Sequence, residues 1–145
     1  MSANGAVLKI YVNYGGNCEE AFRFYEQNLG AKLTRLMRFS EMEGGAPSQF
    51  PPEWKDKVLH ARLEMGGAQL MGNDVPPHIF KPMRSAYLSL EVPSSEEAER
   101  VFALLSDGGD VFKPIQETFF AYRWAMLRDR FGTSWMVTHS RPENA

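Results

Sequence analysis

The chain has 145 residues, the length of one ordinary domain and too short for a catalytic domain with a separate cofactor domain. Hydrophobic residues make up 43% and charged residues 23%, so we expect a folded domain with a real core rather than a disordered chain. Sixteen Lys and Arg against 18 Asp and Glu give a net charge of -2, which argues against nucleic acid as a partner.

The start of the sequence has neither the basic segment nor the long apolar segment of a signal peptide. Its apolar runs are also too short to cross a membrane, so we expect a cytoplasmic protein with no membrane partner. The single cysteine, Cys18, cannot form a disulfide within the chain. Any metal would therefore be held by His, Glu or Asp.

The first half of the chain opens with a predicted strand and helix. Residues 7–14 alternate in the way of a half-buried strand. Asn17 is expected to cap a helix whose apolar residues follow helical spacing, and Gly30 ends it. A second strand is predicted over 32–39. The Gly- and Pro-rich stretch 40–57 has no period and is predicted to be a long loop, either a functional lid or a simple insertion.

Two more predicted strands complete this half. Residues 58–65 alternate, Gly66-Gly67 can supply the positive φ angles of a tight turn, and 68–72 returns as the hairpin partner. A Pro-rich connector over 73–83 then separates the two halves of the chain. Within it we interpret Asp74 as a turn residue.

The second half repeats the order of the first. A strand is predicted over 87–92, and Ser94 with Glu97 forms a capping box at the start of a helix that Gly108-Gly109 ends. Further strands are predicted over 111–118, 120–128 and 134–138, with Asp129 in the turn before the last strand and Trp135 in the core. At an offset of 76 or 77, Tyr11 matches Tyr87 and Tyr25 matches Phe102. Each half therefore reads strand, helix, three strands.

Four motifs carry a resemblance to a known family. They are Asn17-Cys18-Glu19-Glu20-Ala21-Phe22 with Phe24-Tyr25 and Leu29-Gly30, then Gly66-Gly67-Ala68-Gln69-Leu70-Met71, Gln116-Glu117-Thr118-Phe119 and Asp129-Arg130-Phe131-Gly132-Thr133-Ser134-Trp135-Met136. Together with the repeat, they resemble the PhnB-like subgroup of the vicinal oxygen chelate superfamily, which includes glyoxalase I, fosfomycin and bleomycin resistance proteins and extradiol dioxygenases.

The resemblance implies one α+β domain over residues 1–145, built of two tandem βαβββ modules that form a cup-shaped sheet. This is the glyoxalase/bleomycin resistance/dihydroxybiphenyl dioxygenase-like fold, with module one at about 7–74 and module two at about 84–140. It also implies a homodimer and a small-molecule ligand in the cup. Metal-using members place His or Glu on the first and last strands of each module.

The metal positions implied by the resemblance fall near Tyr11, Tyr87, residues 69–71 and Met136. Phenol and thioether groups are poor ligands for a hard divalent ion, so we predict no standard metal quartet and no cofactor, with a divalent metal left open as the alternative. PhnB-like proteins also carry a label as ubiquinone methyltransferases. We find no glycine-rich strand-to-helix loop followed by a downstream acidic residue that would bind S-adenosylmethionine.

The candidate site begins with the strand over 58–65, where His60, Arg62 and Glu64 share one face. We predict His60 as an acid or base, and Arg62 as a clamp for a carboxylate, phosphate or phosphonate. The other reading is that Arg62 and Glu64 simply pair with neighbouring strands. By the same alternation, the substrate-binding face also includes Tyr11, Asn13 and Tyr87.

Three residues of the second half join the candidate site. Glu117 is predicted as a catalytic acid because an acid beside aromatic residues invites a raised pKa, or alternatively it is a solvated turn residue. Tyr122 and Trp124 are predicted to form an aromatic wall for the ligand, or alternatively part of the core.

Three functions remain open on the sequence. The leading hypothesis is a protein of unassigned substrate that binds a small anionic or aromatic metabolite, similar to the metal-free bleomycin-binding branch. The second is a metal-dependent lyase, isomerase or dioxygenase of the glyoxalase type, with a rearranged site around His60 and Glu117. The third is an interaction protein that docks a partner through the 40–57 loop. Whether the protein is an enzyme is not decided by these patterns.

Overall fold

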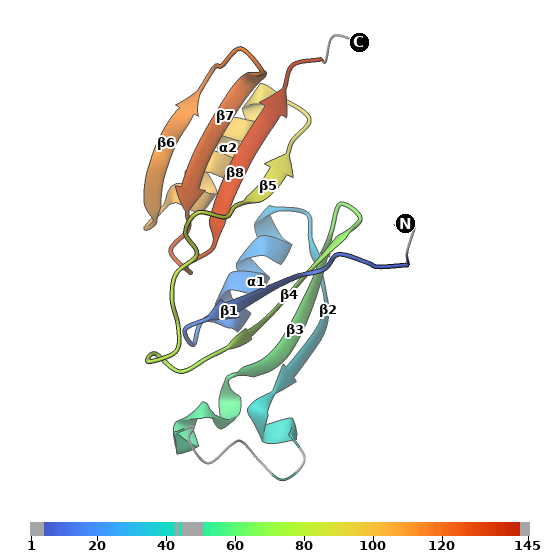
Figure 1. Ribbon diagram of the computed structural model, residues 1–145, viewed down its shortest axis with the longest axis vertical. Helices are drawn as coiled ribbons and strands as arrows, with labels where there is room; N and C mark the ends of the chain where they lie inside the picture. The colour runs from blue at the N-terminus through green and yellow to red at the C-terminus, as the bar shows by residue number, and fades with distance from the viewer. Residues whose placement is uncertain (1–4, 43, 45–50, 143–145) are drawn as a thin grey trace. The chain divides into compact units, whose positions relative to one another are not determined.

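The computed structural model describes residues 5–42, 44 and 51–142. The chain divides into two compact units, which meet in the sequence at Phe80 and Lys81, and we call them module one and module two. Each has its own sheet and its own α-helix (Figure 1). Within the described residues, neither α-helix is long and apolar enough to span a membrane.

The described residues of module one form four strands and one α-helix. The strands are β1 (Ile10–Tyr14), β2 (Lys32–Arg38), β3 (Val58–Met65) and β4 (Ala68–Asp74), the helix is α1 (Cys18–Asn28), and two short 3-10 helices are η1 (Phe39–Glu41) and η2 (Pro52–Asp56). The sheet has the order β1-β4-β3-β2. Strand β1 pairs with β4 in parallel, and the other pairs are antiparallel.

Module two repeats this arrangement. Its elements are β5 (Leu88–Glu91), α2 (Ser95–Ser106), β6 (Asp110–Gln116), β7 (Ala121–Arg128) and β8 (Ser134–Ser140), with the sheet order β5-β8-β7-β6. Strand β5 pairs with β8 in parallel, while the β8–β7 and β7–β6 pairs are antiparallel. The predicted α+β fold of two tandem βαβββ modules is confirmed.

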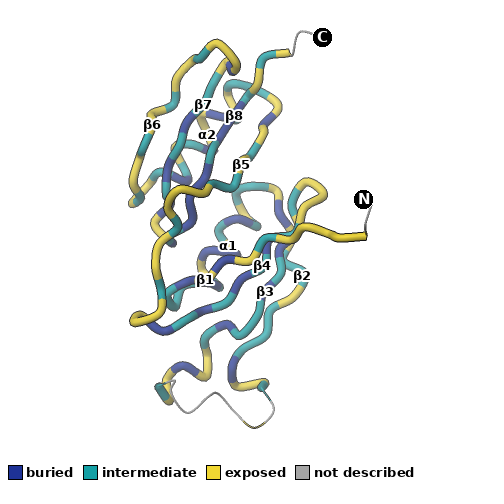
Figure 2. Tube along the Cα trace, in the orientation of Figure 1, coloured by how far each residue is buried: buried dark blue, intermediate teal, exposed yellow. Residues whose placement is uncertain are grey.

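In module one, α1 covers one face of the sheet, and the alternation of β1 follows from this packing. Val12 and Tyr14 are buried on the helix side, where the rings of Tyr14 and Phe22 form an edge-to-face pair with centroids 5.7 Å apart. Figure 2 shows buried segments both on α1 and on the strands of its sheet. Tyr11 and Asn13 point to the other side and are exposed. We call that other side the helix-free face of module one. In β3, Ala61 and Leu63 belong to the buried side, as predicted.

The turn and cap chemistry of the chain is partly as expected. Gly66 and Gly67 have φ angles of 56° and 86°, which confirms the predicted tight turn between β3 and β4. The Ser94 hydroxyl accepts a hydrogen bond from the Glu97 N–H at 3.0 Å, so the predicted cap of α2 is also confirmed. Asn17 is the N-cap residue of α1, as predicted, but its side chain makes no capping hydrogen bond; the helix instead begins with the Ala21 N–H donating to the Asn17 carbonyl at 3.0 Å.

Other boundaries differ from the sequence-based prediction. The first strand starts at Ile10 rather than residue 7, and Val7 and Leu8 are 70% and 95% exposed. The loop predicted over 40–57 contains η2, whose Trp54 is buried. Residues 43 and 45–50 of that loop lie outside the described residues, so its interpretation as a lid stays a prediction.

Candidate functional site

The helix-free face of module one brings four side chains into one row across the sheet. Arg62 of β3 lies opposite Arg35 of β2 on one side and opposite Met71 of β4 on the other. Met71 in turn lies opposite Tyr11 of β1. In the next row, His60 lies opposite Met37. The sheet therefore gathers two guanidinium groups, an imidazole and a phenol on the same face.

Direct contacts link several of the predicted site residues. The rings of Tyr11 and His60 lie 5.9 Å apart between centroids, at an angle of 31°. The Asn13 amide donates a hydrogen bond of 2.7 Å to the side chain of Asn73. The Arg62 Nε donates to the Thr34 hydroxyl at 3.0 Å. Four of the predicted residues, Tyr11, Asn13, His60 and Arg62, thus lie on neighbouring positions of one face.

The electrostatics of this face favour a neutral imidazole. Burial lowers the pKa of His60, and the nearby charges of Arg35 and Arg62 lower it further. Burial raises the pKa of Tyr11 above its ordinary value, with a smaller contribution from Cys18. At neutral pH the face therefore carries two positive charges, together with an uncharged imidazole and an uncharged phenol that can each donate or accept a hydrogen bond.

Glu64 lies apart from this cluster. It is exposed near the hairpin end of β3, where it lies opposite Lys32 of β2 and Gln69 of β4. Its carboxylate therefore has a cationic cross-strand neighbour. Glu64 therefore fits the alternative in which it pairs with a neighbouring strand better than it fits a place in the binding site beside Arg62.

Glu117 and Tyr122 share one partner in module two. Glu117 follows β6, is exposed and forms an ion pair with Arg141. The Arg141 guanidinium also lies 4.6 Å from the centre of the Tyr122 ring, and that ring lies 5.3 Å from the ring of His139. Glu117 is thus a surface carboxylate with a cationic partner, in a different module from His60.

Trp124 and Tyr87 have other neighbours within module two. Trp124 packs edge-on against Phe120 at 5.7 Å and lies opposite Thr138 of β8. A register shift between Ala121 and Arg123 interrupts the alternation of β7, so that Tyr122 contacts His139 instead of joining Trp124. The Tyr87 hydroxyl accepts a hydrogen bond of 2.6 Å from Arg84, and its ring packs edge-on against Phe112.

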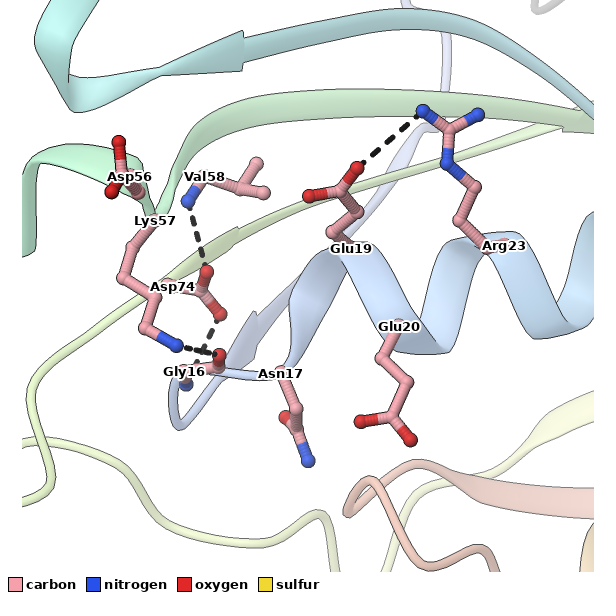
Figure 3. Close-up of a pocket in the computed structure, with 9 residues that line it drawn as sticks. All are labelled: Gly16, Asn17, Glu19, Glu20, Arg23, Asp56, Lys57, Val58 and Asp74. Carbon is pink, nitrogen blue, oxygen red and sulfur yellow. Dashed lines mark hydrogen bonds and ion pairs between the residues drawn. The ribbon is translucent and has the colours of Figure 1, made fainter.

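A cavity of about 430 Å³ lies elsewhere in module one, beside the start of α1 (Figure 3). Its lining includes Gly16, Asn17, Glu19, Lys57 and Asp74. The lining is highly charged, yet Glu19 already pairs with Arg38 at 2.8 Å, and the Lys57 ammonium donates to the Gly16 carbonyl at 2.8 Å. The contact between Lys57 and Gly16 joins the loop before β3 to the start of α1. We therefore interpret the charged residues around the cavity as structural.

Asp74 is the central residue of this region, and its interpretation as a turn residue is wrong. It ends β4, is 1% exposed, and its Oδ1 accepts hydrogen bonds from the N–H groups of Gly16 and Cys18. Its Oδ2 accepts from the Val58 N–H. Burial raises the pKa of Asp74, and the three N–H groups oppose that shift. In the sequence, an aspartate within a Pro-rich connector gave no signal of this role.

The residues at the metal positions implied by the resemblance do not fit a hard divalent ion. Tyr11 lies opposite Met71, and the corresponding positions of module two are Tyr87 and Met136, so the side chains there are phenols and thioethers. Within the described ranges, no group of three or more His, Cys, Asp or Glu side chains is placed to hold a metal. We therefore derive no reaction step through a metal.

Comparison with known proteins places the chain in a family. The family model described as 3-demethylubiquinone-9 3-methyltransferase matches residues 7–138. The chain belongs to this family. A curated relative, protein YjdN of Escherichia coli strain K12, is 32% identical over 139 residues, which cover 90% of this chain and 92% of the relative.

Solved structures agree with the family and the fold. Protein PA1353 of Pseudomonas aeruginosa is 40% identical, with a TM-score of 0.79 over 94% of this chain and 100% of that one. The PhnB protein of Bacillus cereus is 23% identical, with a TM-score of 0.76 over 92% and 99%. FosX of Listeria monocytogenes, a fosfomycin resistance protein, is 11% identical, with a TM-score of 0.62 over 92% and 91%, and shows the fold alone. The predicted PhnB-like resemblance is confirmed.

The description of the family names a methyl transfer. The sheets of this PhnB-like chain can be compared with the fold that binds a nucleotide-type methyl donor. A doubly wound nucleotide-cofactor fold presents its glycine-rich loop from a mostly parallel sheet. Each sheet here has a single parallel pair, β1 with β4 and β5 with β8, and is otherwise antiparallel. The modules do not have the architecture of that cofactor site, and we derive no methyl-transfer step.

The pKa of His60 leads to a prediction about stability in acid. We expect the free energy of unfolding to fall as the pH drops below about 6.5, the ordinary pKa of histidine. The unfolded chain then takes up a proton at His60, whereas the folded chain resists protonation until its lowered pKa is reached. Urea titrations at about pH 7.5 and about pH 5.5 measure this fall. It should be smaller in His60→Gln, and an equal fall in both proteins would contradict the prediction.

Proposed function

We propose that this PhnB-like protein binds a small anionic or aromatic metabolite on the helix-free face of module one. The observation that carries the proposal is the row of Arg35, Arg62, Met71 and Tyr11. Few acidic side chains lie near Arg35 and Arg62 on this face. Accordingly, among the described residues, neither of the two forms an ion pair with a carboxylate. A positive face of this kind favours an anion.

The neighbours of Arg62 suggest how a ligand would be oriented. A carboxylate or another oxyanion would bind its guanidinium, whose Nε is already fixed by Thr34. The tilted rings of Tyr11 and His60 would offer a flat surface to an aromatic or apolar body. His60 would act as the neutral hydrogen-bonding and acid-base group of the site, because its lowered pKa keeps it uncharged.

Relatives support an anionic ligand in general terms. The solved FosX of Listeria monocytogenes is a complex with Mn(II) and a dihydroxypropylphosphonic acid, so the shared fold holds a small anion in that protein. The phenol and thioether groups at the implied metal positions favour recognition by arginine in this chain instead. Glu117, paired with Arg141, has no role in the proposal. The homodimer and the cytoplasmic location, both expected from the sequence, stay predictions.

Binding and mutation together test the proposed function. A panel of small carboxylates, phosphate esters and aromatic acids would be screened by thermal shift, and affinities of the hits measured by calorimetry. We expect Arg62→Gln to weaken binding of an anionic hit about tenfold or more, because a charge-assisted contact is lost. The matched control is Arg100→Gln, an exposed arginine of α2 paired with Glu97. Absence of any hit, or equal affinities in the two variants, would refute the proposal.

A further inference from the structure

Strand β2 contains an irregularity exactly where it passes the candidate site. Leu33 lies opposite Leu63 of β3, but Arg35, two residues further on, lies opposite Arg62. The register thus shifts by one position between Leu33 and Arg35, which makes Thr34 the extra residue of a β-bulge. Such bulges redirect the side chains that follow them.

The shift decides which face of the sheet Arg35 occupies. With the pairing of Leu33 and Leu63 continued regularly, Arg35 would lie opposite Ala61, whose side chain is fully buried on the helix side. The extra residue instead brings Arg35 opposite Arg62, on the helix-free face. Arg35 is exposed there, and among the described residues the one hydrogen-bond partner of its guanidinium is the Met37 sulfur, at 3.7 Å. Without the bulge, the side chain at position 35 would point into the core. With it, the Arg35 guanidinium lies on the helix-free face as a second cation beside Arg62.

Two like charges directly opposite each other on neighbouring strands lower the stability of a sheet. The bulge nevertheless holds Arg62 in place. The bulged residue Thr34 accepts the Arg62 Nε–H at 3.0 Å, and its hydroxyl donates to the Arg62 carbonyl at 3.3 Å. The two terminal nitrogens of Arg62 donate no hydrogen bond to the other described residues, so both remain available to an oxyanion. His60 is the third member of the cluster, and the charges of Arg35 and Arg62 both lower its pKa.

We propose that the Thr34 bulge builds a two-arginine site for a doubly charged oxyanion, of the phosphate or phosphonate class, with His60 as a third hydrogen-bond donor. This deepens the proposed function, and rests on it, by naming the head group of the ligand. Two guanidinium groups match two negative charges, whereas a single carboxylate leaves one of them uncompensated. A tetrahedral group also has three terminal oxygens, enough for both arginines and the imidazole.

The test compares two probes that differ mainly in the charge of the head group. Phenylphosphonate is a dianion at mildly alkaline pH, and benzoate is a monoanion with the same ring. Calorimetry at low salt would measure both on the wild-type chain, on Arg35→Gln and on the control Arg23→Gln, an exposed arginine of α1. We expect wild type to prefer phenylphosphonate by about tenfold or more, and Arg35→Gln to lose most of that preference while its benzoate affinity changes little.

A second readout separates a binding role from a structural one. Removing one of two repelling charges should raise the melting temperature of the unliganded Arg35→Gln variant, even as its affinity for phenylphosphonate falls. Inorganic phosphate is the second probe, and its binding should show the same dependence on Arg35. A lower melting temperature together with equal loss of both ligands would mean that Arg35 supports the fold, and would overturn the two-arginine site.

The outcomes distinguish this inference from the proposed function. If benzoate binding depends on Arg62 but phenylphosphonate is not preferred, the protein binds anions and the dianion site is wrong. If phenylphosphonate is preferred equally by wild type and Arg35→Gln, Arg35 is not part of the site and the inference is also overturned. If none of the probes or screened anions binds, both the proposed function and the inference fall.

Discussion

Replacing Asp74 by alanine should lower the free energy of unfolding by about 3 kcal/mol, because a buried hydrogen-bond acceptor that serves several donors is lost. Three backbone N–H groups, of Gly16, Cys18 and Val58, would be left without their acceptor. The first two lie at the start of α1 and the third at the start of β3, so one carboxylate holds three segments of module one together. Urea titration followed by far-UV circular dichroism measures the loss.

The control for this prediction is Asp56, which lines the same cavity beside the start of α1 as Asp74 does. Asp56 is an exposed aspartate among its lining residues, and Asp56→Ala removes a carboxylate without removing an acceptor from buried N–H groups. We expect a change within about 0.5 kcal/mol for this surface substitution. If the two variants lose similar stability, Asp74 does not have the organising role assigned to it.

Replacing Asp129 by alanine should have a comparable effect, about 3 kcal/mol, in module two. Its Oδ1 accepts hydrogen bonds of 3.0 Å from the N–H groups of Phe131 and Thr133, and its Oδ2 accepts the Trp135 indole N–H at 2.9 Å. Trp135 is 2% exposed, so the variant leaves a buried indole N–H without its partner. Urea titration gives the loss, and near-UV circular dichroism reports on the packing of the tryptophan.

Asp110 of the same module is the matched control. It is paired with Arg128 at 3.1 Å, and its side chain is 63% exposed. An exposed ion pair of this kind contributes about 1 kcal/mol or less, so Asp110→Ala should cost much less than Asp129→Ala. An Asp129→Ala variant as stable as the control would show that the turn before β8 does not depend on its carboxylate.

The elements of the fold were accessible from the sequence because burial imposes a period. Val12 and Tyr14 alternate with Tyr11 and Asn13, and that alternation alone assigns Tyr11 and Asn13 to the helix-free face. The repeat and the family motifs then indicated the tandem modules. Glycine pairs such as Gly66-Gly67 marked turns because few other residues tolerate their φ angles.

Features that depend on contacts far apart in the sequence were not accessible in this way. Asp74 forms its hydrogen bonds with Cys18, 56 positions away, and nothing local distinguishes it from a turn aspartate. The Thr34 bulge is equally hidden, because a register shift is set by pairing with another strand rather than by the residues of its own. Arg35, which the bulge brings beside Arg62, was therefore absent from the residues predicted to form the site.

The parallel pairing of β1 with β4 has a consequence for the order of folding. Strands β2, β3 and β4 join through successive antiparallel pairs, and the β3–β4 hairpin closes over two glycines. Strand β1 instead meets β4 across a long chain separation, with 60 positions between Asn13 and Asn73. Closing that separation costs more chain entropy than closing the hairpin. We therefore expect β1 to be the last strand to join this sheet, so that Tyr11 reaches His60 only in that final step.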